Sequence, residues 1–491
     1  MTATTGPTRT QLLARFATTT RDEDIPAPVR DYGKLVLLDS LICGLAAVRL
    51  RRSRMAQQVA ARFGGPAEAT VFGLGQRVAA INAVHANADM MNALDADDTF
   101  FNSAHFAVFG VAAGLAEAER LHAGGASLLR ASILAFEINA RLNLSTSLMA
   151  FEDGQFRWSP LSSHGYASMG TAAACAVVGG WEPERLAHAL GLIAWLAPPA
   201  KNTYLAERRS FNAFKYGPYG AIAQAGMLGA ALAEEGYTGD LDVLDRTPGF
   251  IEAMGFLGGE RHEMVAGLGS TWWISETSLK PYPTCRFTHA ALDAIRAFPN
   301  THGVPVSQIE SMEIRLSPAA YRTLQFREPA QQIPDTLGAP LDGAFNMPYA
   351  AALVLLGYAP GPQWYDPQRL ADPAVWDLAR RITTAPDPVL DAEWEADLKE
   401  HPGGQIRRTR GALTIRAGGR EYVVESDFAQ GDPWDEATRA DWDFVAGKLA
   451  TFCDGILDAG TQEQLVEVVR GIEDVADVAE TLSPLLARAA Q

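Results

Sequence analysis

The chain has 491 residues, of which 48% are hydrophobic and 20% charged, as in a folded protein with more than one domain. The formal net charge of −17 argues against nucleic acid or an anionic membrane surface as a partner. Four scattered cysteines, an N-terminus without signal-peptide features and no apolar run of about 18 residues predict a cytoplasmic protein without a membrane span.

The first half of the chain has the apolar periodicity of helices. Apolar residues recur there every three to four positions, which is the spacing of one helix face. Stripes of this kind predict helices over 107–121, 126–141, 166–178, 184–196 and 218–235.

The pattern changes after residue 280. Residues 309–316 alternate apolar and polar side chains, as a half-buried strand does. Residues 413–416 and 421–425 flank a Gly-Gly turn and predict a hairpin. Between these strands, 345–357 and 373–382 have helical patterns.

These elements predict a mainly α fold, with a large all-helical domain and a smaller α+β domain. We place the helical domain at residues 1–275 and the α+β domain at residues 276–430. A further apolar stripe in residues 431–491 predicts C-terminal helices that return to the helical domain.

The most informative cluster is Lys280-Pro-Tyr-Pro-Thr-Cys-Arg-Phe-Thr-His289. It brings an ammonium, a thiol, a guanidinium and an imidazole together, although the chain has only six lysines. The two prolines disfavour helix, and a helix start follows at Thr288, where negative charge is favoured. The segment therefore predicts an anion site.

A second cluster, Asn92-Ala-Leu-Asp-Ala-Asp-Asp-Thr99, precedes His105. Its three carboxylates can cap the next helix, orient His105 or hold a metal ion. A hard-cation site would be expected in a glycine-containing ligand loop, which is absent here. Capping and orientation are therefore favoured, and no metal is predicted.

Two further residues, His164 and Lys215, precede small-residue helices. Alone, a histidine or lysine at such a position is more often structural or exposed than functional. A pyridoxal phosphate Schiff base at Lys215 or Lys280 would need a glycine-rich phosphate loop, which neither has. Dinucleotide, Walker and GxSxG motifs are also missing, so no cofactor is predicted.

Five segments in this order resemble the MmgE/PrpD family, which includes 2-methylcitrate dehydratase-like enzymes, cis-aconitate decarboxylases and iminodisuccinate epimerases. The segments are Leu94–Thr99 with His105, Ser163-His-Gly165, Lys215 with Gly220 and Gly226, Leu279–His289, and Tyr422–Pro433. The resemblance implies an active site in a cleft between two domains, a homodimer and no cofactor. Residues matching those that line this cleft in relatives are Asp95, His105, His164, Lys215, Lys280 and Cys285.

The sequence departs from the family pattern at three places. Some relatives have histidine at the position of Cys285. Phe100 and Phe101 stand where a histidine often follows the acidic element, and His105-Phe-Ala replaces His-Pro-Gly or His-Pro-Ser. The aromatic residues predict a more apolar pocket mouth and a substrate less densely charged than a tricarboxylate.

The leading hypothesis is a cofactor-free hydro-lyase, a dehydratase that removes a proton next to a carboxylate of a small hydroxylated carboxylic acid. Epimerisation or decarboxylation by the same residues and a non-catalytic binding protein stay open. We expect either His105 or His164 to be the base, with the other histidine or Tyr282 as the acid. Asp95 would orient a histidine or bind a substrate hydroxyl. The expected carboxylate clamp is Lys215, Lys280 and Arg286, and the further substrate contacts are Cys285, His289 and Asp98.

Overall fold

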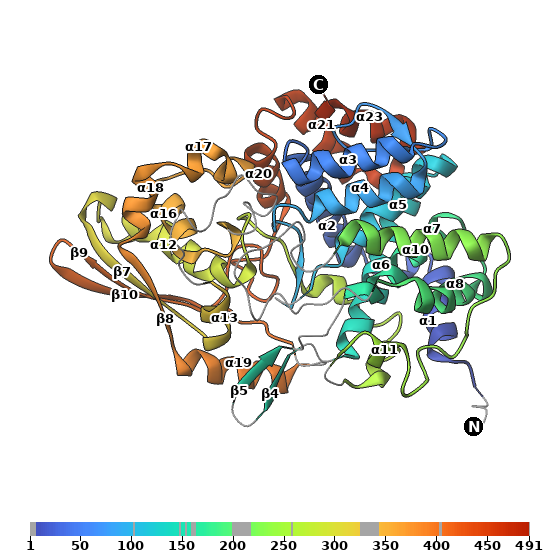
Figure 1. The fold of residues 1–491 in the computed structure, drawn as a ribbon, viewed down its shortest axis with the longest axis horizontal. Helices are drawn as coiled ribbons and strands as arrows, with labels where there is room; N and C mark the ends of the chain where they lie inside the picture. The colour runs from blue at the N-terminus through green and yellow to red at the C-terminus, as the bar shows by residue number, and fades with distance from the viewer. Residues whose placement is uncertain are drawn as a thin grey trace.

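A computed structural model describes residues 6–101, 104–146, 149–152, 155–158, 164–198, 218–256, 259–324, 343–401 and 405–490. The described chain is mostly helical, with a four-stranded sheet in its second half, and this confirms the predicted fold class. Figure 1 shows the helical part beside the part that carries the sheet. The domain limits at residues 275 and 430 stay a prediction.

The helical part is a bundle whose central helices are lined by small side chains. α5, α6 and α7 pack against one another, and α4 and α10 pack side by side next to them. The helices are α1 (Arg9–Thr19), α2 (Ala27–Ala46), α3 (Arg51–Phe63), α4 (Ala80–Met91), α5 (Ala107–Leu121), α6 (Gly125–Leu144), α7 (Ser168–Val178), α8 (Pro183–Leu196) and α10 (Tyr219–Glu234). The five helices predicted from apolar stripes are therefore confirmed.

Short strand pairs connect the helices of this part, where the sequence pattern indicates almost no strand. They are β1 (Ala69–Thr70) with β2 (Arg77–Val78), β3 (Thr99–Phe100) with β6 (Thr277–Ser278), and β4 (Met149–Glu152) with β5 (Gln155–Trp158). Most have only two residues, which is too short for a recognisable alternation. Among the described residues no helix is long and apolar enough to cross a membrane.

The sheet has the strand order β10-β9-β7-β8, with β7 parallel to β8 and antiparallel to β9. The strands are β7 (Ile309–Leu316), β8 (Ile382–Pro386), β9 (Gly411–Ala417) and β10 (Arg420–Ser426). β9 and β10 form the predicted hairpin, with Gly418 and Gly419 both at positive φ. β8 corrects the sequence analysis, because helix α18 (Pro373–Ala379) ends before residue 382, where we predicted its continuation.

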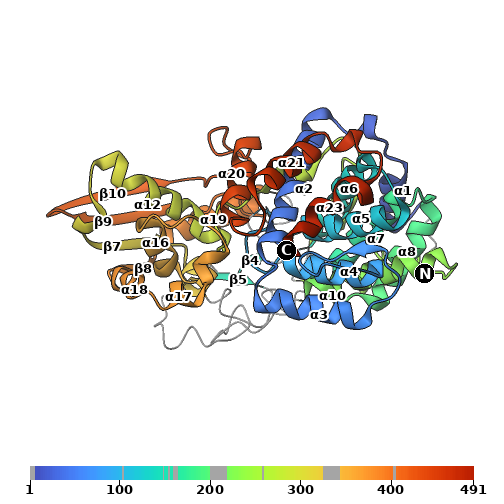
Figure 2. The ribbon, with the colours of Figure 1, turned by 90° about the horizontal axis from the view of Figure 1, so that it is seen from above.

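Helices cover the sheet and close the chain. Figure 2 shows α12 and α16 beside the strands of the sheet, and α20, α21 and α23 back at the helical part. The helices of the second half are α12 (His289–His302), α13 (Pro318–Thr323), α16 (Met347–Leu355), α17 (Pro367–Leu370), α19 (Pro388–Glu400), α20 (Trp442–Phe452), α21 (Ala459–Arg470), α22 (Val478–Thr481) and α23 (Ser483–Ala487). α20 packs against α2, so the end of the chain contacts its beginning.

Candidate active site

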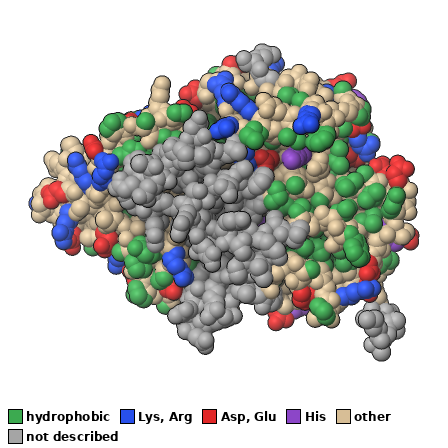
Figure 3. Space-filling view, viewed as in Figure 1, with side chains coloured by type: hydrophobic (Ala, Val, Ile, Leu, Met, Phe, Trp, Pro, Cys, Tyr) green, Lys and Arg blue, Asp and Glu red, His purple; other side chains and the backbone are tan. Residues whose placement is uncertain are grey.

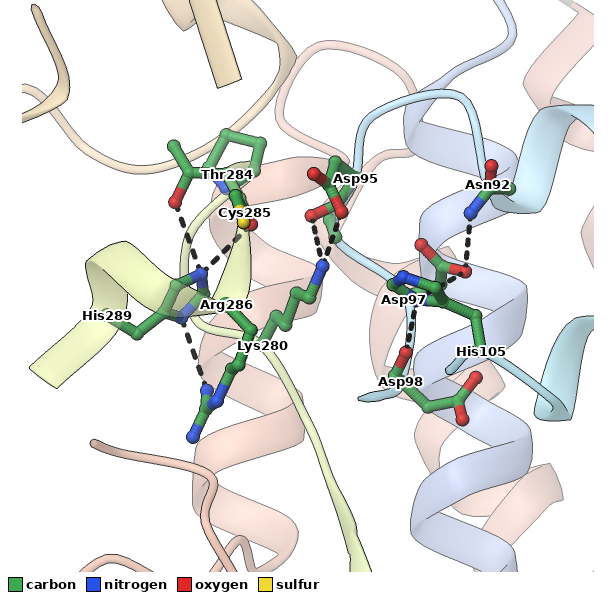
Figure 4. A network of polar contacts seen from close by, with 12 residues as sticks. Asn92, Asp95, Asp97, Asp98, His105, Lys280, Thr284, Cys285, Arg286 and His289 are labelled. Carbon is green, nitrogen blue, oxygen red and sulfur yellow. Dashed lines mark hydrogen bonds and ion pairs between the residues drawn. The ribbon is translucent and has the colours of Figure 1, made fainter. Parts of the chain in front are cut away.

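The antiparallel pairing of β3 with β6 brings the two predicted clusters together. Thr99 pairs with Ser278. Residues just before Thr99 therefore lie beside residues just after Ser278. We call residues 92–98 the acidic loop and residues 279–289 the lysine segment. Figure 4 shows the two facing each other, with Lys280 extended between them.

Lys280 is bound to Asp95 by two contacts. Its Nζ lies 2.5 Å from Asp95 Oδ1 and 3.0 Å from the Asp95 carbonyl oxygen, and both side chains are buried. Asp95 has a φ of 54°, a left-handed conformation that aspartate adopts more readily than most residues. The predicted Lys280 cation thus has a carboxylate partner in the structure.

Buried side chains bind three carbonyl groups of the acidic loop. Lys280 binds the carbonyl of Asp95, and Lys448 Nζ lies 2.7 Å from the carbonyl oxygen of Ala96. His105 Nδ1 lies 2.6 Å from the carbonyl oxygen of Asp98. Because the loop has no regular backbone pairing, these side chains supply the hydrogen bonds that buried carbonyls need.

The contacts of His105 require a proton on Nδ1. A carbonyl oxygen only accepts, so Nδ1 must be the N–H that donates to Asp98, and in the neutral ring Nε2 then carries the lone pair. The Asp97 carboxylate lies 3.3 Å from the same Nδ1 and also accepts from Asn92 Nδ2. This arrangement suits a histidine that accepts a proton at Nε2 while Asp97 stabilises the imidazolium.

Asp98 takes the capping role that the sequence analysis favoured for the acidic cluster. Its carboxylate accepts from the backbone N–H groups of Phe106 and Ala107, where α5 begins, and from the Thr277 hydroxyl. Burial and the nearby Asp97 raise the pKa of Asp98 to about 7. Asp98 therefore holds the loop, α5 and β6 together, and its predicted contact with substrate stays a prediction.

The rings of His105 and His164 both lie near the ring of Tyr219. The ring centroid of Tyr219 is 6.4 Å from that of His105 and 6.2 Å from that of His164, and all three side chains are buried. Tyr219 is the first residue of α10, and sequence reasoning did not select it. Lys215 and Ser163, quoted for the family resemblance, lie outside the described residues.

Arg286 is held by Asp432 rather than left open to a ligand. The guanidinium forms a buried ion pair with Asp432, whose carboxylate also accepts from Ser278 Oγ and from the N–H of Ala429. Gly431 lies at φ 87°, and a Cβ there would be 1.8 Å from the Leu279 carbonyl oxygen. This close approach fixes the lysine segment against the end of the α+β part.

His289 supports Arg286 from the other side. Its Nε2 lies 3.1 Å from the Thr284 carbonyl oxygen, so Nε2 donates and Nδ1 accepts from Arg286. Burial, with Arg286 and Lys280 nearby, lowers the pKa of His289 well below its ordinary value. The neutral ring matches this hydrogen-bond pattern.

Two other predicted site residues have contacts away from the Lys280–Asp95 pair. Cys285 is buried, and its backbone N–H donates to the Ala344 carbonyl. The Tyr282 hydroxyl donates to Asp293, which lines a separate groove of about 590 Å³ between α12 and β10. In the structure the Tyr282 hydroxyl is used in the hydrogen bond to Asp293, and a role as proton donor to a substrate stays a prediction.

The phenylalanines of the family departure form an aromatic cluster. Phe101 is fully buried and stacks on Trp434 with ring centroids 6.0 Å apart. The Arg407 guanidinium lies 5.6 Å from the Phe101 ring centroid and pairs with Glu276, which also accepts from Trp434 Nε1. This cluster joins the helical part to the α+β part, so these residues have a packing role whatever the substrate is.

Asp95, Asp97 and His105 also satisfy the distance requirement for a metal site, since one ligand atom from each lies within 4.8 Å of the others. Asp95 Oδ1, however, is bound by the Lys280 ammonium, which would compete with a cation. The contacts therefore fit orientation of His105 better than metal binding. The absence of a metal stays a prediction.

Four buried residues around the site were not selected from the sequence: Asp39, Tyr219, Asp432 and Lys448. Lys448 Nζ lies 2.6 Å from Asp39 Oδ1, and this pair joins α20 to α2 behind the acidic loop. The rarity of lysine was the only available signal for Lys448, and nothing local distinguishes Asp39 from a capping or surface carboxylate.

Comparison with known families agrees with the geometry. Residues 11–260 match the MmgE/PrpD N-terminal domain and residues 282–474 match the MmgE/PrpD C-terminal domain. The chain therefore belongs to the MmgE/PrpD family.

Among individual relatives, a cis-aconitate decarboxylase of Aspergillus terreus is 24% identical over 97% of this chain and 95% of its own length. A second cis-aconitate decarboxylase, from Aspergillus terreus strain NIH 2624, is 26% identical over 96% of this chain and 95% of its own. The cis-aconitate decarboxylase-like protein oryM of Aspergillus oryzae is 24% identical over 96% of both chains.

Proposed function

We propose that this protein is a lyase that acts next to a carboxylate of a small carboxylic acid by proton transfer, without a cofactor. The observation that carries the proposal is the buried arrangement of the acidic loop, in which Lys280 binds the carbonyl of Asp95 and His105 binds the carbonyl of Asp98. Family membership supports an enzyme, and the relatives' names support an acid substrate.

His105 is the proposed base. Its Nε2 takes the proton from the carbon next to a carboxylate, and the C–H electron pair moves toward that carboxylate. Asp97, 3.3 Å from Nδ1, stabilises the positive ring that results. His164, whose ring also lies near that of Tyr219, then supplies a proton to the other reacting group.

Lys280 is the proposed electrostatic partner of the transition state. Negative charge that develops on the substrate carboxylate is stabilised by an ammonium already fixed in a buried site. Lys215 is proposed to add a second cation. Arg286, which is paired with Asp432 as Lys280 is with Asp95, is proposed to add to the positive potential of the lysine segment.

The two candidate reactions differ in the bond that breaks. In dehydration, which we favoured from the sequence, the carbon–hydroxyl bond breaks and the hydroxyl leaves as water after protonation. In decarboxylation, the carbon–carboxylate bond breaks, CO₂ leaves, and the remaining carbon accepts a proton. The names of the three relatives refer to cis-aconitate decarboxylase. Decarboxylation therefore has to be tested alongside dehydration.

Proton NMR in D₂O tests this function. The purified protein would be incubated with cis-aconitate, citrate and a panel of hydroxy-, unsaturated and amino-dicarboxylic acids. We expect deuterium at a carbon next to a carboxylate, and the product identifies dehydration, decarboxylation or epimerisation.

Single H105A and H164A variants are expected to lower turnover about 10²–10⁴-fold, which is typical for loss of a proton-transfer group. His122, whose ring is exposed on the surface and contacts Asp477, provides a matched control as H122A. Full turnover in both H105A and H164A would contradict the assignment, and no exchange with any acid would favour a non-catalytic binding protein.

The homodimer and the cytoplasmic location also stay predictions. Hydrophobic side chains gather on the face of the helical part that is seen in Figure 3. On α8, Trp195 is 86% exposed. Analytical ultracentrifugation of the wild type and W195E tests whether Trp195 lies in a contact between two subunits. A W195E protein with the same sedimentation as a dimeric wild type would exclude Trp195 from the contact.

A further inference from the structure

Tyr219 has a buried hydroxyl with no hydrogen-bond partner among the described residues. Its side chain is fully buried at the first position of α10, with the ring against Phe109 at a centroid distance of 4.9 Å. Buried hydroxyls in folded proteins nearly always have a partner, and an exception needs an explanation. A ligand oxygen is one such explanation.

The ring of Tyr219 lies beside the proposed site. The ring centroid lies 6.4 Å from that of His105 and 6.2 Å from that of His164, the two proposed proton-transfer residues. Burial raises the pKa of Tyr219 well above its ordinary value, and the carboxylates of the acidic loop add to the rise. The phenol therefore keeps its proton at every working pH and remains a donor.

Tyr166 is a second buried tyrosine near His164, and its hydroxyl has a hydrogen-bond partner. It is also fully buried, and its ring centroid lies 6.3 Å from that of His164, close to the value for Tyr219. Its hydroxyl, however, accepts a hydrogen bond from Asn143 Nδ2 at 3.0 Å. Both tyrosine rings lie near His164, and of the two only Tyr219 has a hydroxyl without a hydrogen-bond partner among the described residues.

We propose that Tyr219 is a substrate-binding residue, whose O–H donates to a carboxylate oxygen of the acid on which His105 and His164 act. This inference rests on the proposed function, because it requires such an acid. The phenol does not transfer its proton. It binds the carboxylate and gains strength as negative charge develops there during the reaction.

The test compares Y219F with Y166F, since each variant removes one hydroxyl and keeps the ring. The kinetics are measured with the acid that the wild type turns over, and binding of cis-aconitate and citrate is measured by calorimetry. We expect Y219F to lower kcat about 10²-fold, the typical loss of one oxyanion donor, and to bind the acid more weakly. The pH profile of kcat/KM should keep its shape, because the phenol does not titrate.

Thermal stability separates a ligand contact from a structural contact. Y219F should melt at or above the wild-type Tm, because a buried hydroxyl without a protein partner is removed. Y166F should melt lower, because Asn143 Nδ2 loses its acceptor, and the kcat of Y166F should fall less than that of Y219F.

Two outcomes overturn the inference. Wild-type kinetics and affinity in Y219F would show that the hydroxyl contacts no substrate. A lower Tm in Y219F with unchanged kinetics would show that a structural contact, such as an ordered water, uses it. A wild type that neither turns over nor binds any acid would instead overturn the proposed function, together with the substrate role of Tyr219.

Discussion

Two buried lysines, Lys280 and Lys448, bind neighbouring carbonyls of the acidic loop. They come from different regions of the chain, and we expect one to act in catalysis and the other to support the loop. Lys280 approaches from the lysine segment and binds the carbonyl of Asp95, and Lys448 approaches from α20 and binds the carbonyl of Ala96. Each also contacts a carboxylate, at 2.5 Å for Lys280–Asp95 and 2.6 Å for Lys448–Asp39.

The difference lies in where the carboxylate partner belongs. Asp95 is part of the acidic loop, so the Lys280 pair joins the lysine segment directly to the proposed reacting groups. Asp39 is on α2, so the Lys448 pair joins two helices and reaches the site only through the Ala96 carbonyl. Similar local geometry therefore suits catalysis in one case and support in the other.

Removing Lys280 is the change with the largest expected effect. K280M deletes the ammonium that faces the proposed substrate carboxylate, and kcat should fall about 10²–10³-fold. It also leaves Asp95 buried without its cation, which costs about 3–5 kcal/mol of stability. Steady-state kinetics and urea unfolding measure the two effects.

The variant D95N/K280M separates these two effects. It removes the buried charge together with the ammonium, so stability should recover most of the loss while activity does not. Recovery of activity in D95N/K280M would assign Lys280 a structural role like that of Lys448.

Removing Lys448 should affect stability first and activity second. K448M leaves Asp39 buried without a cation, whereas D39L/K448M replaces the pair by apolar side chains and should be close to the wild type in stability. The Ala96 carbonyl has lost its donor in both variants. A small shift of the acidic loop is then expected to lower kcat about 10²-fold at most.

The pair Lys34–Glu473 provides a matched control. It also joins α2 to the C-terminal region, at 2.7 Å, but contacts no residue of the acidic loop. K34M/E473L should change stability by about 1 kcal/mol or less and leave kcat unchanged. Hydrogen exchange of residues 94–99 should increase in D39L/K448M and not in the control. Equal kcat in both double variants would mean that Lys448 does not position the loop.

The helices were predictable because each carries its own pattern. The apolar stripes over 107–121 and 184–196 end within one residue of α5 and α8, since burial of one face repeats every turn. β8 was not predictable in this way. Its five residues form a strand because β7 offers a parallel partner, and no local signal records that partner.

Within the site, too, some residues can be recognised from local sequence and others only from the packing of distant segments. Asp95, His105 and Lys280 stand in segments dense with chemical groups, and the β3–β6 pairing brings these segments together. Lys448 and Asp39 are 409 residues apart and stand alone in helical sequence. Only the packing of α20 on α2 gives them a role, so a single sequence contains no pattern that connects them.

Asp98 differs from the two carboxylates that are paired with lysines. It belongs to the acidic loop, but its carboxylate accepts hydrogen bonds from backbone N–H groups and from the Thr277 hydroxyl. Its pKa is about 7 in the folded protein, against an ordinary value of 3.8, chiefly because of burial and secondarily because of Asp97. The folded state therefore binds this proton more tightly than the unfolded state. This proton contributes on the order of 4 kcal/mol to the free energy of unfolding. The contribution is complete below about pH 4 and is lost as the pH rises through about 7.

The variant D98N should flatten the fall in unfolding free energy between pH 4 and 8. Part of the slope should remain, because burial also raises the pKa of Glu137 to about 7, despite the nearby Arg141. E137Q is therefore the matched control, and D98N/E137Q should be flatter than either single variant. Urea unfolding at pH 5, 6, 7 and 8 measures the slopes, with His105 and Asp97 as the nearest other groups that titrate. A D98N slope equal to that of the wild type would show that Asp98 is already ionised in the folded protein, and that backbone N–H groups stabilise a buried carboxylate as well as the two lysines do.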